Sequence, residues 1–316
     1  MTQSFRKYTS LLFCFCLLFV FSDCNKKNES SAVTTFPDFV TENVIVLVVD
    51  GPRWSETWGD AQCRYIPNMK NNLAPRGVIN ENFHNWGVTR TIPGHTAILT
   101  GVYEDINNAG HEFPANPSFL QTWLKQTNSN PNKAWIVSAK PKIGKLGNTL
   151  DIKWRNSFMP SVDALYHEDI WTFDRIKDCI NDYHPKLMFI NLSGPDKRGH
   201  EGRWNAYLRA IRETDSMVNQ LQNILDTDPF YAGKTTLIVS NDHGRHLDGI
   251  SDGFVSHGDQ CSGCTHINFF ASGPDFKENV ILNVPREQID IAPTVAYLLG
   301  FEMEDGDGKI MKELFK

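Results

Sequence analysis

The chain has no long apolar run and no excess of positive charge, and each of these shortages excludes a class of protein. Its 31 lysines and arginines stand against 37 aspartates and glutamates, which gives a net charge of −6. Nucleic-acid binding depends on basic side chains that neutralise phosphates, so no nucleic-acid-binding surface is evident. A small phosphorylated substrate remains possible, because metal ions can neutralise such a molecule locally.

Internal repeats and low-complexity stretches are also absent. The chain has 316 residues, of which 41% are hydrophobic, so it is long enough to bury a full core. The longest apolar run, Leu11–Phe21, is too short for a comfortable membrane span. Arg6 and Lys7 precede this run and Ser22–Cys24 follows it, an order typical of an export signal over residues 1–24.

Cys24 resembles the lipid acceptor of a bacterial lipoprotein. Asp23 departs from the small residue usual before such a cysteine, so plain cleavage and a retained anchor stay open. The polar residues 25–41 are expected to form a tether, and a lipid on Cys24 is the only membrane contact predicted. The expected location is the periplasm or the outer membrane of a Gram-negative bacterium.

Four cysteines remain for an oxidising compartment: Cys63, Cys179, Cys261 and Cys264. A single CxxC segment supplies too few ligands for a structural zinc site of the usual four-cysteine kind. Cys261 and Cys264 are therefore predicted to form a small disulfide that stiffens the loop after His257, with free thiols as the alternative. The pairing of Cys63 with Cys179 stays open.

From about Glu42 the sequence alternates between buried strands and amphipathic helices. This alternation predicts a three-layer α/β/α sandwich with a mostly parallel central sheet. The expected strands cover residues 44–49, 134–138, 187–192, 236–240 and 267–271. Residues 42–316 are expected to form one catalytic domain, with a small cap or rim at about 104–183, where prolines are frequent.

Helix signals fill the gaps between the strands. Apolar residues recur at helical spacing within Arg203–Asp226. Pro117 and Pro285 stand where a first helical turn would begin. The segment Ile289–Gly300 ends on a glycine in C-cap position.

Three aspartates follow predicted strands at or just beyond their carboxyl ends: Asp50, Asp196 and Asp242. In an open α/β sheet this edge collects ligands and catalytic groups. One such aspartate is usually a turn residue, but three with histidines attached indicate a metal site. The spacing of Asp196 and His200 lets one helical turn aim both at one cation, and the adjacent Asp242 and His243 offer the same donors.

Carboxylate with imidazole suits zinc, and manganese or iron is the alternative. Two nearby histidines are interpreted as bystanders or outer-shell groups: His246 and His266. A hydroxyl comes from Thr91, which opens a helix that runs through His95 to Thr100. The positive end of the helix dipole and coordination to a metal would both lower the pKa of the Thr91 hydroxyl. Such a hydroxyl is suited to act as a nucleophile.

These segments together resemble the alkaline phosphatase superfamily, nearest the nucleotide pyrophosphatase/phosphodiesterase type. The matching motifs are Asp50-Gly51, Thr91-Ile-Pro-Gly-His95, Pro195-Asp-Lys-Arg-Gly-His200, Asp242-His-Gly244 and His257-Gly258. The resemblance covers about 43–300 and implies a metal-dependent hydrolase of phosphoric esters: a phosphodiester, a pyrophosphate or a monoester.

The resemblance also implies roles for individual residues. One divalent ion, zinc by preference, would be held by Asp196, His200 and His257. A second would be held by Asp50, Asp242, His243 and the oxygen of Thr91. Thr91 would attack phosphorus in line, and the phosphothreonine would then be hydrolysed.

The sequence departs from this pattern in the residues that would bind the phosphoryl group. Relatives carry His-Gly and then Asn after the nucleophile helix, whereas here the segment Tyr103–Glu112 offers Asn107 or Asn108 as the donor. Lys153 and Arg155 are similar in form to the Lys-x-Arg pair of some alkaline phosphatases. The alternative is that this pair is part of a solvated loop.

Other functions of the same superfamily remain open. Sulfatases need Cys or Ser in a Cys/Ser-x-Pro-x-Arg segment, and Thr91 and His95 occupy those two places. Phosphotransferase or mutase chemistry is another possibility. A surface lipoprotein that only binds glycans, through Trp54, Trp58, Trp86 and Trp154, is the non-enzymatic alternative, but buried carboxylates without metals would be costly.

Overall fold

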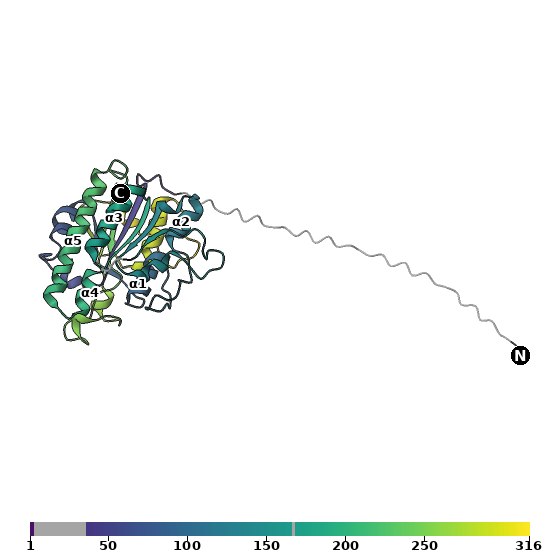
Figure 1. Ribbon diagram of the computed structural model, residues 1–316, viewed down its shortest axis with the longest axis horizontal. Helices are drawn as coiled ribbons and strands as arrows, with labels where there is room; N and C mark the ends of the chain where they lie inside the picture. Colours follow the sequence, from purple (N-terminus) through teal and green to yellow (C-terminus); the bar gives the residue numbers. More distant parts are fainter. Residues whose placement is uncertain (3–35, 166–167) are drawn as a thin grey trace. The chain divides into compact units, whose positions relative to one another are not determined.

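The computed structural model describes residues 1–2, 36–165 and 168–316, and Phe36–Lys316 form one compact unit (Figure 1). The predicted export signal, Cys24 and residues 25–35 of the predicted tether lie outside the described residues. Residues 36–41 belong to the compact unit instead of the tether. The Phe39 ring lies 5.4 Å from that of Tyr297, and the Thr41 hydroxyl donates to Asp275 at 2.6 Å.

A sheet of eight strands forms the centre of this unit, in the order β5-β4-β6-β1-β7-β8-β2-β9. All neighbouring strands are parallel except β8, which runs antiparallel to both β7 and β2. The strands are β1 (Asn43–Val49), β2 (Gly77–Asn80), β4 (Ala134–Ser138), β5 (Ser161–Asp163), β6 (Leu187–Leu192), β7 (Thr235–Ser240), β8 (Phe269–Ser272) and β9 (Val280–Leu282). A separate two-stranded sheet pairs β3 (Phe83–His84) with β10 (Arg286–Glu287).

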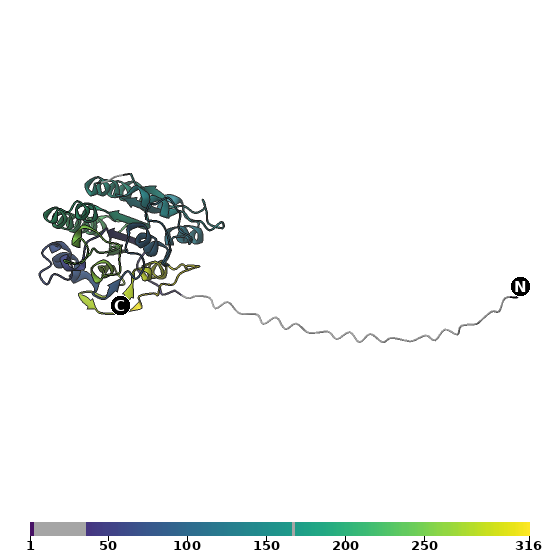
Figure 2. The same ribbon diagram turned by 90° about the horizontal axis from the view of Figure 1, so that it is seen from below.

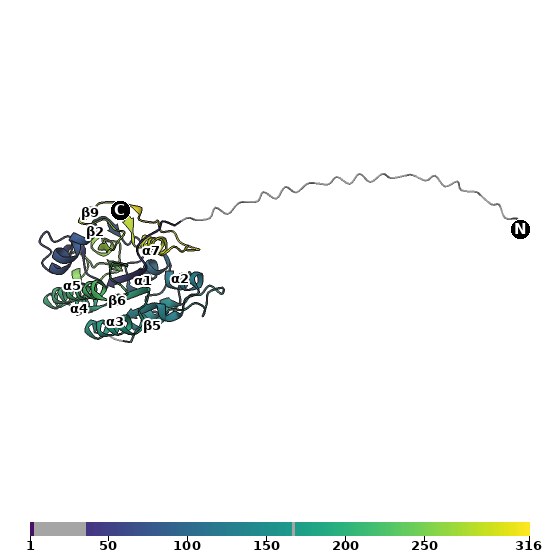
Figure 3. The same ribbon diagram turned by 90° about the horizontal axis from the view of Figure 1, so that it is seen from above.

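Helices cover both faces of the sheet. They are α1 (Thr91–Thr100), α2 (Phe119–Thr127), α3 (Asp169–Tyr183), α4 (Gly194–His200), α5 (Trp204–Thr227), α6 (Ser262–Thr265) and α7 (Ile291–Leu299). In Figure 3, α1, α2 and α7 lie on one side of the strands and α3, α4 and α5 on the other, and Figure 2 shows the same layers from the opposite side. The predicted α/β/α sandwich is confirmed.

Two apolar cores fill the space between the layers. Val44, Val46 and Val48 point into the core shared with α1, α2 and α7, whereas the alternate residues of β1 point into the core shared with α3 and α5. All seven residues of β1 are buried. This double burial explains the nearly continuous apolar sequence of the strand.

All five predicted strands are present, but the last one differs from the prediction in its bounds and in its direction. It begins at Phe269 instead of Ile267 and runs antiparallel, although its apolar sequence resembles that of its parallel neighbours. A strand covered on both faces is apolar in either direction, so composition does not reveal its orientation. The short strands β2, β5 and β9 have too few residues to show a recognisable run or alternation of apolar side chains, so the sequence does not predict them.

The helix predictions are confirmed except at Pro285. The predicted helix over 203–226 is α5, α2 begins after Pro117 with Ser118 as its N-cap, and Gly300 ends α7 with a φ of 69°. Pro285 instead precedes the short strand β10, and α7 begins only at Ile291. Within the described residues, no helix has the length and apolar content needed to cross a bilayer.

Residues 104–183 contribute more to the sandwich than to a rim. Two helices and two strands of the layers, α2, α3, β4 and β5, come from this stretch. The longest connecting segments, at 104–118 and 139–160, lie outside these elements. One of them begins directly at the carboxyl end of β4.

The register of the central strands brings their carboxyl ends to one edge. Val49 of β1 pairs with Leu192 of β6, and Val48 pairs with Ser240 of β7. Residues that follow these strands therefore start from neighbouring positions. Asp169 at the start of α3 holds the segment after β6, because its carboxylate accepts from the backbone amides of Ser193 and Gly194 at 2.7 and 2.8 Å.

Asp169→Ala should destabilise the fold at this connection. Both backbone amides would lose their acceptor in a buried position, which costs about 1–3 kcal/mol of unfolding free energy. Urea denaturation measures this loss. Asp174→Ala on the same helix is the matched control, because the Asp174 side chain is half exposed and pairs only with Lys177 at the surface. Equal stability of the two variants would disprove the assigned role of Asp169.

Candidate active site

The residues predicted as metal ligands meet at the carboxyl edge of the sheet. One group has its ligand atoms within 4.8 Å of one another and contains Asp50, Asp242 and His243. A second group at the same spacing contains Asp196, His243 and His257. His243 belongs to both groups, whereas the sequence assigned it to the first alone.

His200, the last residue of α4, lies beside the second group. Its Nε2 lies 3.2 Å from Asp196 Oδ1 and 3.1 Å from His257 Nε2. Asp196 and His200 are four residues apart on this helix, as the spacing predicted. The side chain of His200 is 47% exposed, so the centre opens towards solvent on this side.

Backbone carbonyls fix the orientation of two of the imidazoles. The Nδ1 of His243 lies 2.8 Å from the carbonyl oxygen of Gly244, and the Nδ1 of His257 lies 2.8 Å from that of Thr89. A carbonyl can only accept, so each Nδ1 carries the proton and each Nε2 keeps its lone pair. Both Nε2 atoms face the carboxylates, which is the arrangement found in histidines that bind metal through Nε2.

Thr91 is the first residue of α1 and is buried beside this centre. The helix packs closely because position 94 is glycine: a Cβ there would lie 2.6 Å from the carbonyl oxygen of Asp242. One turn later, His95 Nδ1 lies 2.7 Å from the Thr91 carbonyl oxygen and 3.2 Å from Asp242 Oδ2. The Thr-x-Pro-Gly-His segment thus positions the hydroxyl and one carboxylate together.

Lys140 is the main residue that sequence reasoning missed. Its ammonium lies 2.8 Å from Asp50 Oδ2, 2.6 Å from Asp196 Oδ2 and 3.3 Å from Thr91 Oγ1. It follows β4, which is the neighbour of β6 in the sheet, and therefore stands at the same edge as the aspartates. Functional residues collect just beyond the carboxyl ends of strands, and a search of these positions for basic as well as acidic residues would have found Lys140.

Two further side chains complete the surroundings of the carboxylates. The fully buried Arg245 donates to Asp196 Oδ1 at 2.5 Å and also to the carbonyl oxygens of Phe254 and Val255. Asn191 of β6 donates to Asp50 Oδ2 at 3.2 Å, and its amide nitrogen lies 3.0 Å from His95 Nε2. Neither residue carries a motif that would distinguish it in the sequence.

The pKa values show how strongly charge is concentrated here. Burial and the nearby Asp242 carboxylate raise the pKa of Asp50 to about 6. Burial also opposes ionisation of Asp196, but the Lys140 ammonium and the imidazoles of His200 and His257 beside it hold its pKa well below the usual value. Burial lowers the pKa of His243 to about 3, so this imidazole is neutral and able to bind a cation.

Several polar atoms of the centre have no hydrogen-bond partner among the described residues: Asp50 Oδ1, both carboxylate oxygens of Asp242, and His243 Nε2. Each is buried, and a buried acceptor without a partner is costly. His243 Nε2 lies 3.6 Å from Asp50 Oδ1 and 3.2 Å from Asp242 Oδ2. Carboxylate oxygens and imidazole nitrogens at this spacing fit a divalent cation, and they match the donor types of zinc sites.

The four residues predicted to bind the phosphoryl group fall in two places. Asn108 lies beside Thr91, because its side-chain oxygen accepts from the backbone amide of the next residue, Ile92, at 2.9 Å. Asn107 is exposed and accepts from the amide of Ala109.

Lys153 and Arg155 are not brought to the ligand cluster in the described part of the chain. Both are exposed, and they flank Trp154, which is 1% exposed. Burial of this tryptophan turns its two neighbours outward. Lys140 supplies the cation that the sequence analysis sought at these positions.

The four tryptophans proposed as a glycan surface do not share one face. Trp154 is buried in the core, whereas Trp86 is 54% exposed. Trp54 stacks on His266, and Trp86 stacks on His84, each at 4.5 Å between ring centroids. His266 is therefore part of an aromatic stack, which agrees with its interpretation as a bystander of the metal centre.

Comparisons with known proteins agree with the fold and identify the family. The chain belongs to the Sulfatase family, whose profile matches residues 42–301, and thus to the alkaline phosphatase superfamily. Mouse GPI ethanolamine phosphate transferase 1 is 25% identical over 311 residues, which cover 82% of this chain and 31% of that protein. The chain thus spans about a third of the length of this relative.

Two solved structures share the fold at low sequence identity. The wild-type alkaline phosphatase PafA superposes with a TM-score of 0.66 at 14% identity, covering 90% of this chain and 100% of that chain. Murine ectonucleotide pyrophosphatase/phosphodiesterase 5 superposes with a TM-score of 0.62 at 15% identity, covering 87% and 100%. The chain is therefore an enzyme of this metal-dependent superfamily.

Removing divalent ions with a chelator should lower the thermal unfolding midpoint, because the buried carboxylates would then lack their counter-charges. Two sites, each occupied at about 100 times its dissociation constant, predict a shift of roughly 10 °C or more. Differential scanning calorimetry measures it.

The double variant Asp50→Asn/Asp242→Asn should lose about half of this response, because the ligands Asp196, His200 and His257 remain, whereas the exposed pair Asp174→Asn/Asp178→Asn on α3 should keep all of it. An unchanged midpoint after verified metal removal would argue against a metal centre.

Proposed function

We propose that the protein hydrolyses phosphoric esters, with Thr91 as the nucleophile and two divalent ions, zinc by preference, as cofactors. The observation that carries the proposal is the position of Lys140, whose ammonium contacts the Thr91 hydroxyl and bridges Asp50 and Asp196. A hydroxyl next to the carboxylates of two ligand groups is suited to attack a phosphorus atom held by the same cations. The substrate would be a small diester, pyrophosphate or monoester.

Two sets of side chains would each bind one metal ion. Asp50, Asp242 and His243 would hold one ion, and Asp196, His200 and His257 the other, with His243 near both. The ions would act as Lewis acids on the phosphoryl oxygens and would lower the pKa of the nucleophile.

In the first step the Thr91 oxygen bonds to phosphorus while the bond from phosphorus to the leaving oxygen breaks, and the proton of the Thr91 hydroxyl passes to the leaving group, which departs as an alcohol. Water then cleaves the phosphothreonine, which returns the hydroxyl. Lys140 would stabilise negative charge on Thr91 and on the phosphoryl group in both steps. The position of α1 supports this, since the positive end of its dipole faces the same oxygen.

Hydrolysis of sulfate esters is a weaker candidate function, although the matching family is named Sulfatase. Sulfatases build their nucleophile from Cys or Ser, whereas this chain has threonine at position 91. At position 95 the imidazole binds Asp242 and Asn191 inside the core and is fully buried. These contacts favour a threonine-based phosphoryl centre.

Transfer to an alcohol is the second candidate, and the similarity to a GPI ethanolamine phosphate transferase favours it. Both reactions would pass through the same phosphothreonine and differ in the acceptor. Water leads to hydrolysis, whereas an acceptor alcohol leads to a new ester. An assay in the presence of excess alcohol separates the two reactions. Release of free phosphate or phosphomonoester indicates hydrolysis, whereas formation of a new ester indicates transfer.

We also propose that the protein is exported and that Cys24 carries a lipid. The basis is the sequence order of basic residues, apolar run and cysteine within residues 1–24. Mass spectrometry of the mature N-terminus tests this proposal. A mature chain that begins elsewhere than Cys24, without a lipid, would refute it.

Thr91→Ala should abolish turnover of nitrophenyl phosphate esters, because no other hydroxyl replaces the nucleophile. We expect a loss of at least about 10³-fold in kcat, with the metal content unchanged. Thr91→Ser is the matched control and should keep measurable activity and a trapped phosphoenzyme.

Parallel assays with bis-ester, mono-ester and sulfate substrates identify the ester class. Turnover of the sulfate ester alone, or full activity in Thr91→Ala, would exclude the proposed reaction.

Lys140→Met should lower kcat by about 10²–10³-fold, the range seen when one donor to a developing oxyanion is removed. Metal content should stay the same, because the lysine is not itself a ligand. Lys145→Met is the control, since Lys145 is exposed in the turn that follows. If both variants retained full activity, Lys140 would have no part in charge stabilisation.

A further inference from the structure

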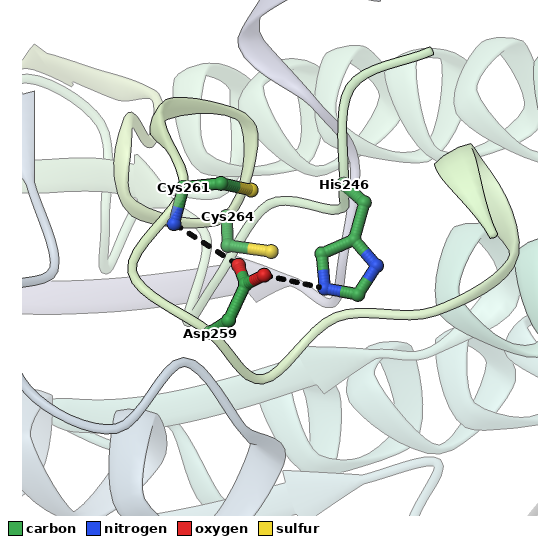
Figure 4. A group of neighbouring side chains, drawn as sticks. All are labelled: His246, Asp259, Cys261 and Cys264. Carbon is green, nitrogen blue, oxygen red and sulfur yellow. Dashed lines mark hydrogen bonds and ion pairs between the residues drawn. The ribbon is translucent and has the colours of Figure 1, made fainter. Parts of the chain in front are cut away.

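A second set of metal-binding side chains lies outside the catalytic centre. The structure has Cys261 and Cys264 as free thiols, so the predicted disulfide is absent. Their sulfur atoms lie with a nitrogen of His246 and an oxygen of Asp259, all within 4.8 Å of one another (Figure 4). His246 comes from the loop after β7, Asp259 and Cys261 come from the segment after His257, and Cys264 lies in the short helix α6 that follows.

The orientation of His246 favours a cation at this place. Its Nδ1 lies 3.1 Å from Asp252 Oδ1 and 3.3 Å from Ser256 Oγ. Its Nε2 lies on the other side of the ring, 3.3 Å from Asp259 Oδ2. A carboxylate that holds Nδ1–H leaves the Nε2 lone pair free, and histidines that bind zinc through Nε2 commonly have such an outer carboxylate.

We propose that His246, Asp259, Cys261 and Cys264 bind a third metal ion, zinc. The set has the four ligands that a closed tetrahedral site needs, and thiolate with imidazole is the donor mixture that selects zinc. Zinc bond lengths imply ligand separations of about 3.3–3.8 Å, so small side-chain movements would bring the atoms into range. The CxxC segment lacks two cysteines for the usual site, and His246 and Asp259 take their places.

The site would tie together the two loops that carry catalytic ligands. His246 stands three residues after His243, and Asp259 stands two residues after His257. The loops already pair through their backbones, because the amide of Gly244 donates to the Cys264 carbonyl at 2.8 Å and that of Arg245 donates to Gly263 at 2.9 Å. A metal across the side chains would fix this pairing, and it would do so whether or not the catalytic proposal holds.

A disulfide between Cys261 and Cys264 is the competing state. It would remove both thiolates and leave the histidine and the carboxylate without a metal. The intact mass of the full chain, isolated without reductant, distinguishes the two, since a disulfide chain is lighter by two hydrogens. That lighter mass would overturn the proposal.

Cobalt substitution tests the site through its spectrum. The full chain exchanged with Co²⁺ should show a thiolate-to-cobalt charge-transfer band in the near ultraviolet. The catalytic centre has only carboxylate, imidazole and hydroxyl ligands, so this band reports the proposed site alone. A cobalt-loaded protein with reduced thiols and no such band would refute the site.

The double variant Cys261→Ser/Cys264→Ser should lose the band and bind one zinc ion fewer per chain. Cys63→Ser is the matched control, because Cys63 is a free thiol far along the chain from this loop, and it should keep both. Should the double variant fold poorly, alkylation of the wild-type chain gives the same information. Metal should protect Cys261 from alkylation, and its removal should expose it; equal rates would count against the site.

These outcomes are separate from those that test the catalytic proposal. Loss of hydrolysis in Thr91→Ala with the cobalt band intact would support both proposals. An active enzyme without the band would refute the third site alone. An inactive enzyme that shows the band would leave the zinc assignment standing and would reject the proposed reaction.

Discussion

The burial of three carboxylates at one edge of a parallel sheet is the constraint on which the rest of this structure depends. Asp50, Asp196 and Asp242 are each at most 5% exposed and face a common space. Two like charges about 4 Å apart repel by roughly 4 kcal/mol at the effective dielectric constant near protein surfaces. Lys140 and Arg245 offset part of this charge, but three carboxylates still outnumber these two cations. Divalent cations would correct that imbalance, and they would also explain the unpartnered oxygens and the neutral imidazole of His243.

The same constraint explains why small residues surround the centre. A Cβ at position 51 would lie 3.0 Å from the side chain of Asp196, and Gly51 also has a φ of 77°, which favours glycine. Gly94 lets α1 approach the backbone of Asp242. The positions of the carboxylates and of the helix that carries Thr91 are therefore set by backbone packing. Their geometry does not depend on long flexible side chains, which suits a site that must hold a reacting group in place.

The sequence predicted those parts of the fold and the site that depend on local pattern. Strand–aspartate motifs identified Asp50 and Asp242, and the four-residue spacing in one helical turn identified His200, because strand ends and helix faces follow from chain geometry. Lys140 was missed because only acidic residues were sought beyond the strand ends, whereas the position of Arg245 depends on how one loop folds back, which no local pattern encodes. The orientation of β8 was missed for a related reason, since an apolar strand reads the same in both directions. The pairing of Cys261 with Cys264 was predicted from two residues, whereas the structure places His246 beside them from a separate loop.

Anomalous diffraction at the zinc absorption edge, from crystals of the purified full chain, tests the central claim most directly. Two peaks should appear at the sheet edge, one among Asp50, Asp242 and His243 and the other among Asp196, His200 and His257. Their separation should be about 3.5–4 Å, as in other two-metal hydrolases. A well-ordered electron density map in metal-saturated crystals that shows the three carboxylates paired with Lys140 and no anomalous peak beside them would contradict the two-metal centre.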